Sequence, residues 1–127
     1  MVLDAVQFVL QDVLPRLTVR ERLASLTVHP TCSSTRIGTN DALVALAGAI
    51  AEEVVVPIDW GCCGFAGDRG LLHPELTASA TRREAAAVAD NPSTAYVSCN
   101  RTCEIGMARA TGHEFHHVLE LLERVTR

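Results

Sequence analysis

The chain has 127 residues, of which 48% are hydrophobic and 20% are charged, and its formal net charge is −4 at pH 7. This length and composition are typical of one soluble globular domain with a sizeable hydrophobic core. The mild negative charge and the lack of a basic stripe argue against a nucleic-acid-binding role. We therefore expect residues 1–127 to form a single domain without a nucleic-acid partner.

Neither a secretion signal nor a membrane span is expected. Polar residues at Asp4, Gln7, Gln11 and Asp12 interrupt the apolar N-terminal stretch, whereas a signal peptide needs an unbroken apolar core. No run of apolar residues approaches the length of a membrane-spanning helix. The number of cysteines is five, which is odd, and without a secretion signal this favours a reducing compartment. The sequence therefore predicts a cytoplasmic location.

Helices and strands are expected to alternate along the chain. Helices are predicted where apolar residues recur at helical spacing, and strands where short apolar or β-branched runs are bounded by turns. In chain order, the predicted elements are a helix over 2–14, a strand over 23–28, a helix over 40–53, a strand over 54–58, a helix over 75–89, a strand over 94–97, a helix over about 100–110 and, after a short extended segment, a helix over 117–125.

This alternation predicts the fold class. Strands that alternate with helices of ten or more residues imply right-handed crossovers and a parallel sheet. We therefore expect an α/β fold in which an open parallel sheet of three to four strands is layered between crossover helices, together with an N-terminal helix.

The cysteines fall into three groups: Cys32 alone, Cys62 with Cys63, and Cys99 with Cys103. Adjacent cysteines bounded by glycines are poorly suited to a hydrophobic core. A flexible, glycine-bounded turn instead allows both thiols to face one partner. Each group follows the carboxyl end of a predicted strand, and these ends meet at one edge of a parallel sheet, where ligand sites lie. The pattern predicts that the groups converge in space as a set of ligands.

The chemistry of thiolates favours two kinds of bound group, iron–sulfur clusters and zinc. Cys103 is expected in the first turn of a helix, where exposed amides and the helix dipole lower the pKa of a thiol. The glycines of the cysteine loop would let backbone amides approach a cluster or an anion. For Cys32 or Cys99 alone, a role as a small buried hydrophobic residue is the alternative.

A further group of residues is expected to support the thiols without replacing them. His29 precedes a proline at a strand end, where it either hydrogen-bonds the cysteine loop or only shapes the turn. Asn100 is a candidate cap for the following helix. Arg101 would offset negative charge on the thiolates, with simple exposure to solvent as the alternative. The supporting residues are His29, Gly61, Gly64, Asn100 and Arg101.

Two other patterns are weaker indications of binding. The histidines at positions 113, 116 and 117 form a cluster that is expected mainly in solvent, with metal ligation as the alternative. The glycines around the adjacent cysteines do not have the spacing of a dinucleotide-binding fingerprint, and the chain has no lysine for a phosphate-binding loop. A nucleotide site is therefore not expected.

Three stretches of the chain carry a resemblance to a known family. These are His29-Pro30-Thr31-Cys32-Ser33, Gly61-Cys62-Cys63-Gly64-Phe65-Ala66-Gly67 and Asn100-Arg101-Thr102-Cys103-Glu104-Ile105-Gly106-Met107. Together they resemble the cysteine-rich CCG domain, which is found in heterodisulfide reductases, in the iron–sulfur subunit of glycolate oxidase and in lactate-utilisation proteins. The chain looks most like the carboxyl-terminal domain of FAD-linked D-lactate dehydrogenases, and the resemblance covers nearly its whole length.

The resemblance implies a site and a context. In such families the cysteines hold an iron–sulfur cluster or sometimes zinc, a role that would fall here on Cys32, Cys62, Cys63 and Cys103. The family often has two residues between the last two cysteines, whereas this chain has three, which sets Cys99 apart as the doubtful ligand. The resemblance further implies that the chain is a fragment of a longer oxidoreductase with flavin (FAD) and ferredoxin-like domains, which can contact a membrane electron acceptor peripherally.

Three functions are consistent with these expectations. The leading one is an electron-transfer domain that passes electrons from a reduced flavin, because the chain holds no complete active site for oxidising a 2-hydroxy acid itself. The second is a zinc-holding structural or interaction domain. The third is a thiol–disulfide redox domain in which Cys62 or Cys63 attacks a disulfide.

Overall fold

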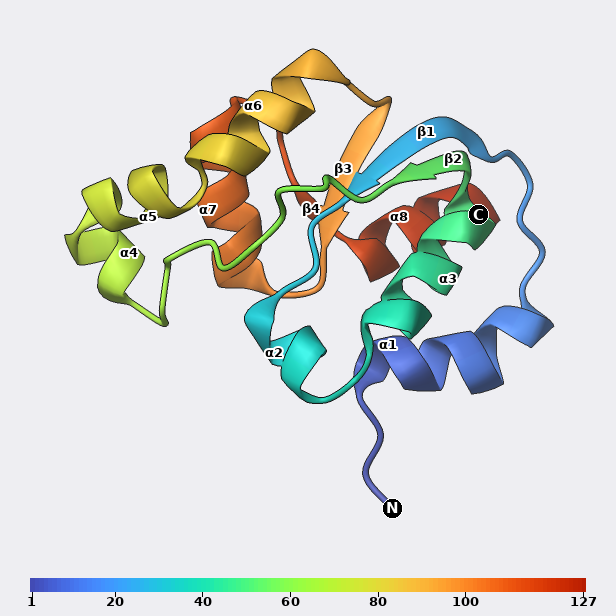
Figure 1. Cartoon of the computed structure of the whole chain (residues 1–127). Coiled ribbons are helices and arrows are strands. Elements are labelled where there is room, and N and C mark those ends of the chain that lie inside the picture. The colour runs from blue at the N-terminus through green and yellow to red at the C-terminus, as the bar shows by residue number, and fades with distance from the viewer.

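The computed structural model describes residues 1–127 and shows an α/β fold built on a four-stranded, all-parallel sheet (Figure 1). The predicted fold class, an open parallel sheet with crossover helices, is confirmed. The strand order is β2-β1-β3-β4. The strands are β1 (Leu23–Val28), β2 (Ala51–Val55), β3 (Ala95–Ser98) and β4 (His116–His117).

Helices cover both faces of the sheet (Figure 1). One face is covered by a group of three helices, α1, α3 and α8. The other face is covered by α6 and α7, while α4 and α5 extend beyond the sheet edge. None of the helices is both long and apolar enough to cross a membrane. The helices are α1 (Ala5–Phe8), α2 (Cys32–Arg36), α3 (Asn40–Ile50), α4 (Arg69–Leu72), α5 (Pro74–Ala80), α6 (Arg82–Asp90), α7 (Arg101–Thr111) and α8 (Val118–Thr126).

Each face of the sheet has its own hydrophobic core. The larger core lies under α3 and α8, where each fully buried leucine or isoleucine contributes about 1.5–3 kcal/mol relative to an exposed one. The smaller core, on the face covered by α6 and α7, consists of Val88, Tyr96, Met107 and Phe115. The larger core consists of Val6, Leu26, Val28, Leu43, Leu46, Ala47, Ile50, Ala51, Val97, Val118, Leu121, Leu122 and Val125.

The strand order places a switch point between β1 and β3. From β1 the chain crosses to β2 on one side, and from β2 it returns to β3 on the other side of β1. Beyond the paired strands, the His29 amide donates to the Val97 carbonyl at 2.9 Å and Ser98 Oγ donates to the His29 carbonyl at 2.7 Å. Because ligands of open α/β sheets bind at such a switch point, a ligand site is expected beyond the ends of β1 and β3.

The boundary between α3 and β2 differs from the sequence prediction. The helix predicted over 40–53 ends at Ile50, and the strand predicted over 54–58 begins at Ala51. The Arg22 guanidinium donates to the carbonyl oxygens of Gly48 and Ala51, at 2.5 and 2.7 Å, and so satisfies groups that the end of the helix leaves free. Arg22 lies far away in sequence, so local periodicity could not indicate this stop.

Two other predicted helices are subdivided. The N-terminal helix predicted over 2–14 is present, but α1 passes into a π-helical turn over Val9–Val13 and a 3-10 turn over Leu14–Arg16. The helix predicted over 75–89 is divided at Thr81 into α5 and α6. Thr81 Oγ1 donates to the Thr77 carbonyl at 2.7 Å, a back-bond that often bends a helix. The sequence prediction assigned no helix to the residues that form the short helices α2 and α4.

Candidate functional site

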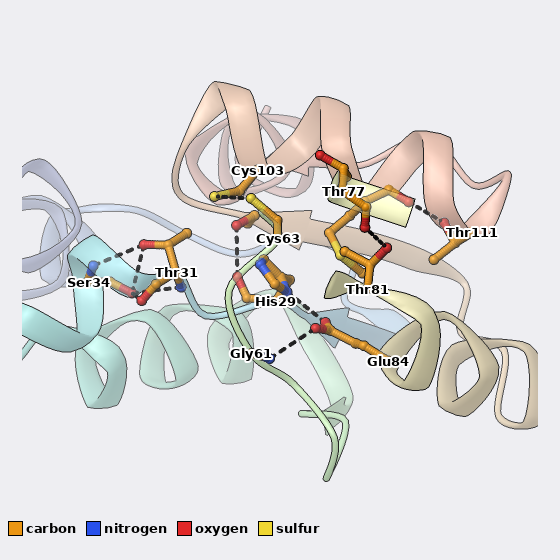
Figure 2. A network of polar contacts seen from close by, with 12 residues as sticks. His29, Thr31, Ser34, Gly61, Cys63, Thr77, Thr81, Glu84, Cys103 and Thr111 are labelled. Atoms are coloured by element: carbon orange, nitrogen blue, oxygen red, sulfur yellow. Dashed lines mark hydrogen bonds and ion pairs between the residues drawn. The ribbon is translucent and has the colours of Figure 1, made fainter. Parts of the chain in front are cut away.

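The three cysteine groups lie beyond the carboxyl ends of three neighbouring strands. Cys32 begins α2 after β1, the adjacent cysteines lie in the loop after β2, and Cys103 lies in the first turn of α7 after β3. The sulfurs of Cys63 and Cys103 are 3.4 Å apart (Figure 2). Cys99 Sγ lies 3.8 Å from the hydroxyl of Thr31, the residue before Cys32. The sheet edge thus brings distant parts of the sequence together.

The thiols differ in their exposure to solvent. Cys63 and Cys103 are buried, with exposed fractions of 4% and 5%, Cys99 is partly buried, and Cys32 and Cys62 are exposed. None of the five is in a disulfide. The site therefore has a buried pair of thiols in contact and two exposed cysteines at its rim.

The loop that carries Cys63 is fixed by close packing. Gly64 has φ +71°, and a Cβ there would lie 2.9 Å from Ala80 Cβ and 3.0 Å from the Leu76 carbonyl oxygen, so only glycine fits against α5. The next residue, Phe65, is buried with Cys63 and Cys103 in a small cluster of its own. This glycine-bounded loop, which was predicted to be flexible, therefore packs against α5 at Gly64 and joins the Cys63–Cys103 cluster at Phe65.

A buried acid and a buried base lie beside the thiol pair. His29 at the end of β1 is 0% exposed and Glu84 on α6 is 2% exposed, and His29 Nδ1 lies 2.6 Å from Glu84 Oε2 (Figure 2). The other carboxylate oxygen of Glu84 accepts a hydrogen bond from the Gly61 amide at 3.3 Å. Figure 2 shows His29 between Glu84 on one side and Cys63 on the other.

Sequence reasoning did not single out Glu84. It lies in the alanine-rich segment Arg82–Asp90, where a charged residue is usually assigned to the solvent face. The signal that could have found it is its position on the helix, four residues before the buried Val88 and therefore on the same face.

The electrostatics of the site favour a thiolate at Cys63. The contact with Cys103 lowers the pKa of Cys63, burial opposes this, and His29 and the Phe65 amide lower it further, to about 4. The same contact with Cys63, together with burial, raises the pKa of Cys103 well above its usual range. The charges of Cys32 and Cys99 raise it further. Cys103 therefore keeps its proton and shares it with the Cys63 sulfur.

The histidine beside the thiolate is held in its charged form. Burial lowers the pKa of His29, but the Cys63 thiolate and the Glu84 carboxylate outweigh burial and raise it to about 9. Its second ring nitrogen, Nε2, is buried and has no hydrogen-bond partner. The other ring nitrogen, Nδ1, is engaged by Glu84 at 2.6 Å.

The remaining predicted supporting residues have local roles. Asn100 caps α7, accepting hydrogen bonds from the Thr102 amide at 3.1 Å and the Thr102 hydroxyl at 2.9 Å. Arg101 forms an ion pair of 3.1 Å with the buried Glu104, so its charge is directed to that carboxylate. Burial raises the pKa of Glu104, and Arg101 partly offsets the shift.

The C-terminal histidines do not act together. His113 stacks on the ring of Tyr96 with centroids 4.3 Å apart, His116 lies 3.7 Å from the Glu114 carboxylate, and His117 caps α8 by accepting from the Leu119 amide at 3.2 Å. Across the chain, no group of three or more His, Cys, Asp or Glu side chains is already placed to hold a single metal ion.

Fold and site together define the chain as an α/β protein with a three-part cysteine cluster at the switch point of a parallel sheet. Comparison with protein-family models, curated proteins and solved structures finds no match to this chain.

Proposed function

We propose that the chain is the iron–sulfur-binding, electron-transfer domain of an FAD-linked 2-hydroxy-acid dehydrogenase, of the D-lactate or glycolate-oxidising kind. The observation that carries the proposal is the arrangement of cysteines from three chain segments at one sheet edge, with Cys63 and Cys103 in contact. The resemblance of the cysteine motifs to the CCG domain supports the choice of parent enzyme.

The donor chemistry of the site fits a cluster. Thiolate is the ligand form of cysteine, and Cys63 is poised as a thiolate beside a protonated partner. Cys103 lies in the first turn of α7, but its pKa is raised by the contact with Cys63 and by burial, contrary to the lowering expected from its helix position. No group of three or more side chains is placed to hold a single ion, and the proposal is therefore of a cluster, whose iron atoms take separate thiolate ligands. The proposed ligands are Cys32, Cys62, Cys63 and Cys103, with Cys99 as an additional neighbour.

The rest of the activity is assigned to other parts of a longer protein. The cluster, when bound, accepts and releases single electrons. We propose that the electrons come from a reduced flavin through a ferredoxin-like domain and continue to an acceptor, which a membrane can carry. This chain's own residues ligate, bury and hydrogen-bond the cluster, which sets its potential.

The first experiment is anaerobic reconstitution with iron and sulfide, followed by iron, sulfide and zinc analysis and by absorption spectra before and after dithionite. Stoichiometric iron and sulfide with a visible band that dithionite bleaches is the expected result. Zinc alone would instead favour a structural or interaction domain, and failure to bind any metal would contradict both.

Cysteine variants separate ligands from neighbours. Cys63→Ser and Cys103→Ser are expected to lose the cluster, because both are central to the buried pair. Cys99→Ser is expected to retain most of the iron, since its sulfur contacts Thr31 instead of that pair. Equal loss of iron from Cys99→Ser and Cys103→Ser would contradict this assignment.

The Cys63–Cys103 contact also favours a second candidate, a thiol–disulfide redox function. The Cys63 thiolate would attack a disulfide substrate and release one thiolate, which leaves a mixed disulfide on Cys63. Cys103, after losing its proton, would attack Cys63 and release the second thiolate. The substrate gains two electrons, and the two cysteines become a disulfide.

Metal-free protein tests this second candidate. Incubation of the Cys103→Ser variant with glutathione disulfide is expected to trap glutathione on Cys63, and wild type is expected to yield a Cys63–Cys103 disulfide instead, both read by peptide mass. Because Cys63 is 4% exposed, the attack requires opening of its loop. Absence of both products would reject the thiol–disulfide function.

A further inference from the structure

Helices α4 and α5 follow the cysteine loop and extend beyond the sheet edge (Figure 1). Their buried residues are Gly70 and Thr77, which leaves the larger apolar side chains in solvent. Three leucines, here called the leucine face, are exposed by 58% at Leu71, 72% at Leu72 and 43% at Leu76. The part of the molecule that projects farthest from the sheet edge on this side thus carries an apolar surface.

The leucine face differs from the other exposed apolar residues of the chain. Single exposed hydrophobic residues are normal on a protein surface, whereas grouped ones mark an interaction site. The leucine face has three within six consecutive residues. Outside it and the first eight residues, the exposed large hydrophobic residues are single, at Leu17, Ile37, Val44 and Ile58. The leucine face is therefore a candidate interaction surface.

Four arginines lie on or beside α4 and α5. Arg69 begins α4, and the pair Arg82 and Arg83 begins α6 directly after α5. Arg109 of α7 donates to the Gly70 carbonyl of α4 at 3.4 Å. All four arginines are exposed, and none forms an ion pair with a carboxylate. The leucine face is therefore bordered by free positive charge.

The acidic residues of this segment do not cancel that charge. Residues 66–83 contain three arginines but only two acids, Asp68 and Glu75, before Arg109 is considered. Of the two acids, Glu75 lies 3.2 Å from His73. The chain as a whole carries a net charge of −4. The leucine face thus belongs to a locally cationic part of an acidic protein.

This combination of apolar and cationic residues favours one kind of partner. At an anionic bilayer, leucines enter the boundary of the acyl chains while arginines remain beside the phosphates. The other apolar group, at residues 1–3, has Asp4 and Asp12 nearby and no arginine before Arg16, so the same bilayer repels it. A second copy fits less well, because a two-fold contact would bring the same arginines together.

We propose that α4 and α5 form a membrane-docking element, which binds the surface of a bilayer containing anionic lipid through the leucine face and the arginines beside it. The inference goes beyond the proposed function and needs no bound cluster, since it concerns only side chains of the polypeptide. These short helices lie in the plane of the interface. Because the cysteine loop leads directly into α4, docking holds the cysteine site beside the membrane.

The first test is co-sedimentation of metal-free, reduced protein with vesicles. Wild type is expected to bind vesicles of phosphatidylglycerol and phosphatidylcholine, to bind them less as the salt concentration rises, and not to bind phosphatidylcholine alone. Leu71→Ser/Leu72→Ser is expected to lower the partition coefficient at least about tenfold. The matched control is Val2→Ser/Ile58→Ser, which changes residues exposed by 98% and 97% elsewhere and should bind as wild type. Absence of wild-type binding to the anionic vesicles would overturn the proposal.

Charge variants distinguish a defined surface from general attraction. Arg82→Gln/Arg83→Gln is expected to lower the partition coefficient about tenfold at low salt, because two arginines leave the lipid surface. Arg16→Gln/Arg20→Gln removes the same charge from the segment between α1 and β1, at the other end of the sheet (Figure 1), and is expected to change binding little. An equal loss in both variants would contradict docking through α4 and α5.

Fluorescence locates the residues that enter the bilayer, and it serves also if the leucine variant fails to fold. Trp60 is the only tryptophan of the chain, so a Trp60→Phe background leaves a single introduced probe. Brominated lipid in the anionic vesicles is expected to quench the emission of Leu72→Trp and to leave that of Ile58→Trp unchanged. Quenching of neither probe, or of both equally, would overturn the assignment of the surface.

Two further measurements separate the remaining outcomes. Analytical ultracentrifugation is expected to show a monomer, whereas a dimer that Leu71→Ser/Leu72→Ser dissociates would mean that a second copy covers the leucine face, which would overturn the proposal. Iron content decides the proposed function independently. Protein that binds anionic vesicles but no iron would retain this inference and reject the proposed function, and protein that binds iron but no vesicles would do the reverse.

Discussion

At the scale of single residues, the two buried thiols of the site are not equivalent. They share a contact of 3.4 Å, yet the pKa of Cys63 is lowered and that of Cys103 is raised. The contact with Cys103, which supplies the shared proton, lowers the pKa of Cys63 most, and His29 and the Phe65 amide lower it further. The buried pair thus carries one negative charge, which the positive charge of His29 offsets.

The charge on Cys63 gives a pH dependence in metal-free protein. Because its pKa is lowered to about 4, the ultraviolet absorption of one thiolate is expected to persist at neutral pH and to disappear as the pH falls through about 4. The measurement is an anaerobic pH titration of that absorption. Cys63→Ser should remove the acidic transition and Cys32→Ser should leave it, whereas a transition that survives in Cys63→Ser would contradict the assignment.

The packing of Gly64 gives a stability prediction at the same scale. Gly64→Ala adds a Cβ at positive φ that meets Ala80 at 2.9 Å and the Leu76 carbonyl at 3.0 Å, so we expect the free energy of unfolding to fall by ~2–4 kcal/mol. Gly67→Ala is the matched control, since Gly67 has φ +72° in the same loop but open space around it. This variant should lower the free energy of unfolding by only ~1 kcal/mol. Urea unfolding measures both, and equal losses would contradict the close contact.

At the scale of elements, most helices and strands could be predicted from local sequence patterns. Each exception has an identifiable physical cause. Helix α8 and strand β1 follow from local patterns, an amphipathic face and a short strand-forming run that ends in the buried residues Leu26, Thr27 and Val28. The end of α3 depends on Arg22, which reaches it from before β1, so no local pattern encodes it. The position of each cysteine group after a strand end followed from parallel topology, whereas the burial of Glu84 beside His29 depends on the packed position of α6.

The N-terminal cap of α7 contributes to the free energy of unfolding, and this contribution can be measured. Asn100 accepts from Thr102 at the helix start, and Asn100→Ala is expected to lower the free energy of unfolding by ~1 kcal/mol, because a helix amide loses its acceptor. Asn100→Asp should keep most of the stability, since a carboxylate also caps. Chemical denaturation of the metal-free protein checks both variants, and equal losses in the two would mean that the cap does not stabilise α7.

At the scale of the whole molecule, the site joins segments that the sheet alone does not hold together. The loop after β2 and helices α4 and α5 extend beyond the sheet edge, and they are tied to it through Cys63, Phe65 and the Glu84–Gly61 contact (Figure 1). A cluster ligated by Cys32, Cys63 and Cys103 would add covalent links between β1, this loop and α7. Binding would therefore stabilise the loop more than the sheet.

Amide hydrogen exchange tests this consequence. Loading with iron and sulfide is expected to slow exchange at residues 61–70 at least about tenfold, because opening of the loop would then require a ligand bond to break. Amides in β1 and β3 are expected to change less, since the two hydrophobic cores already protect them. The Cys63→Ser variant, treated in the same way, is the control and should show no slowing. Uniform slowing across the chain would indicate that the loop and the sheet already open as one unit, which would contradict the separate role assigned to the cysteine loop.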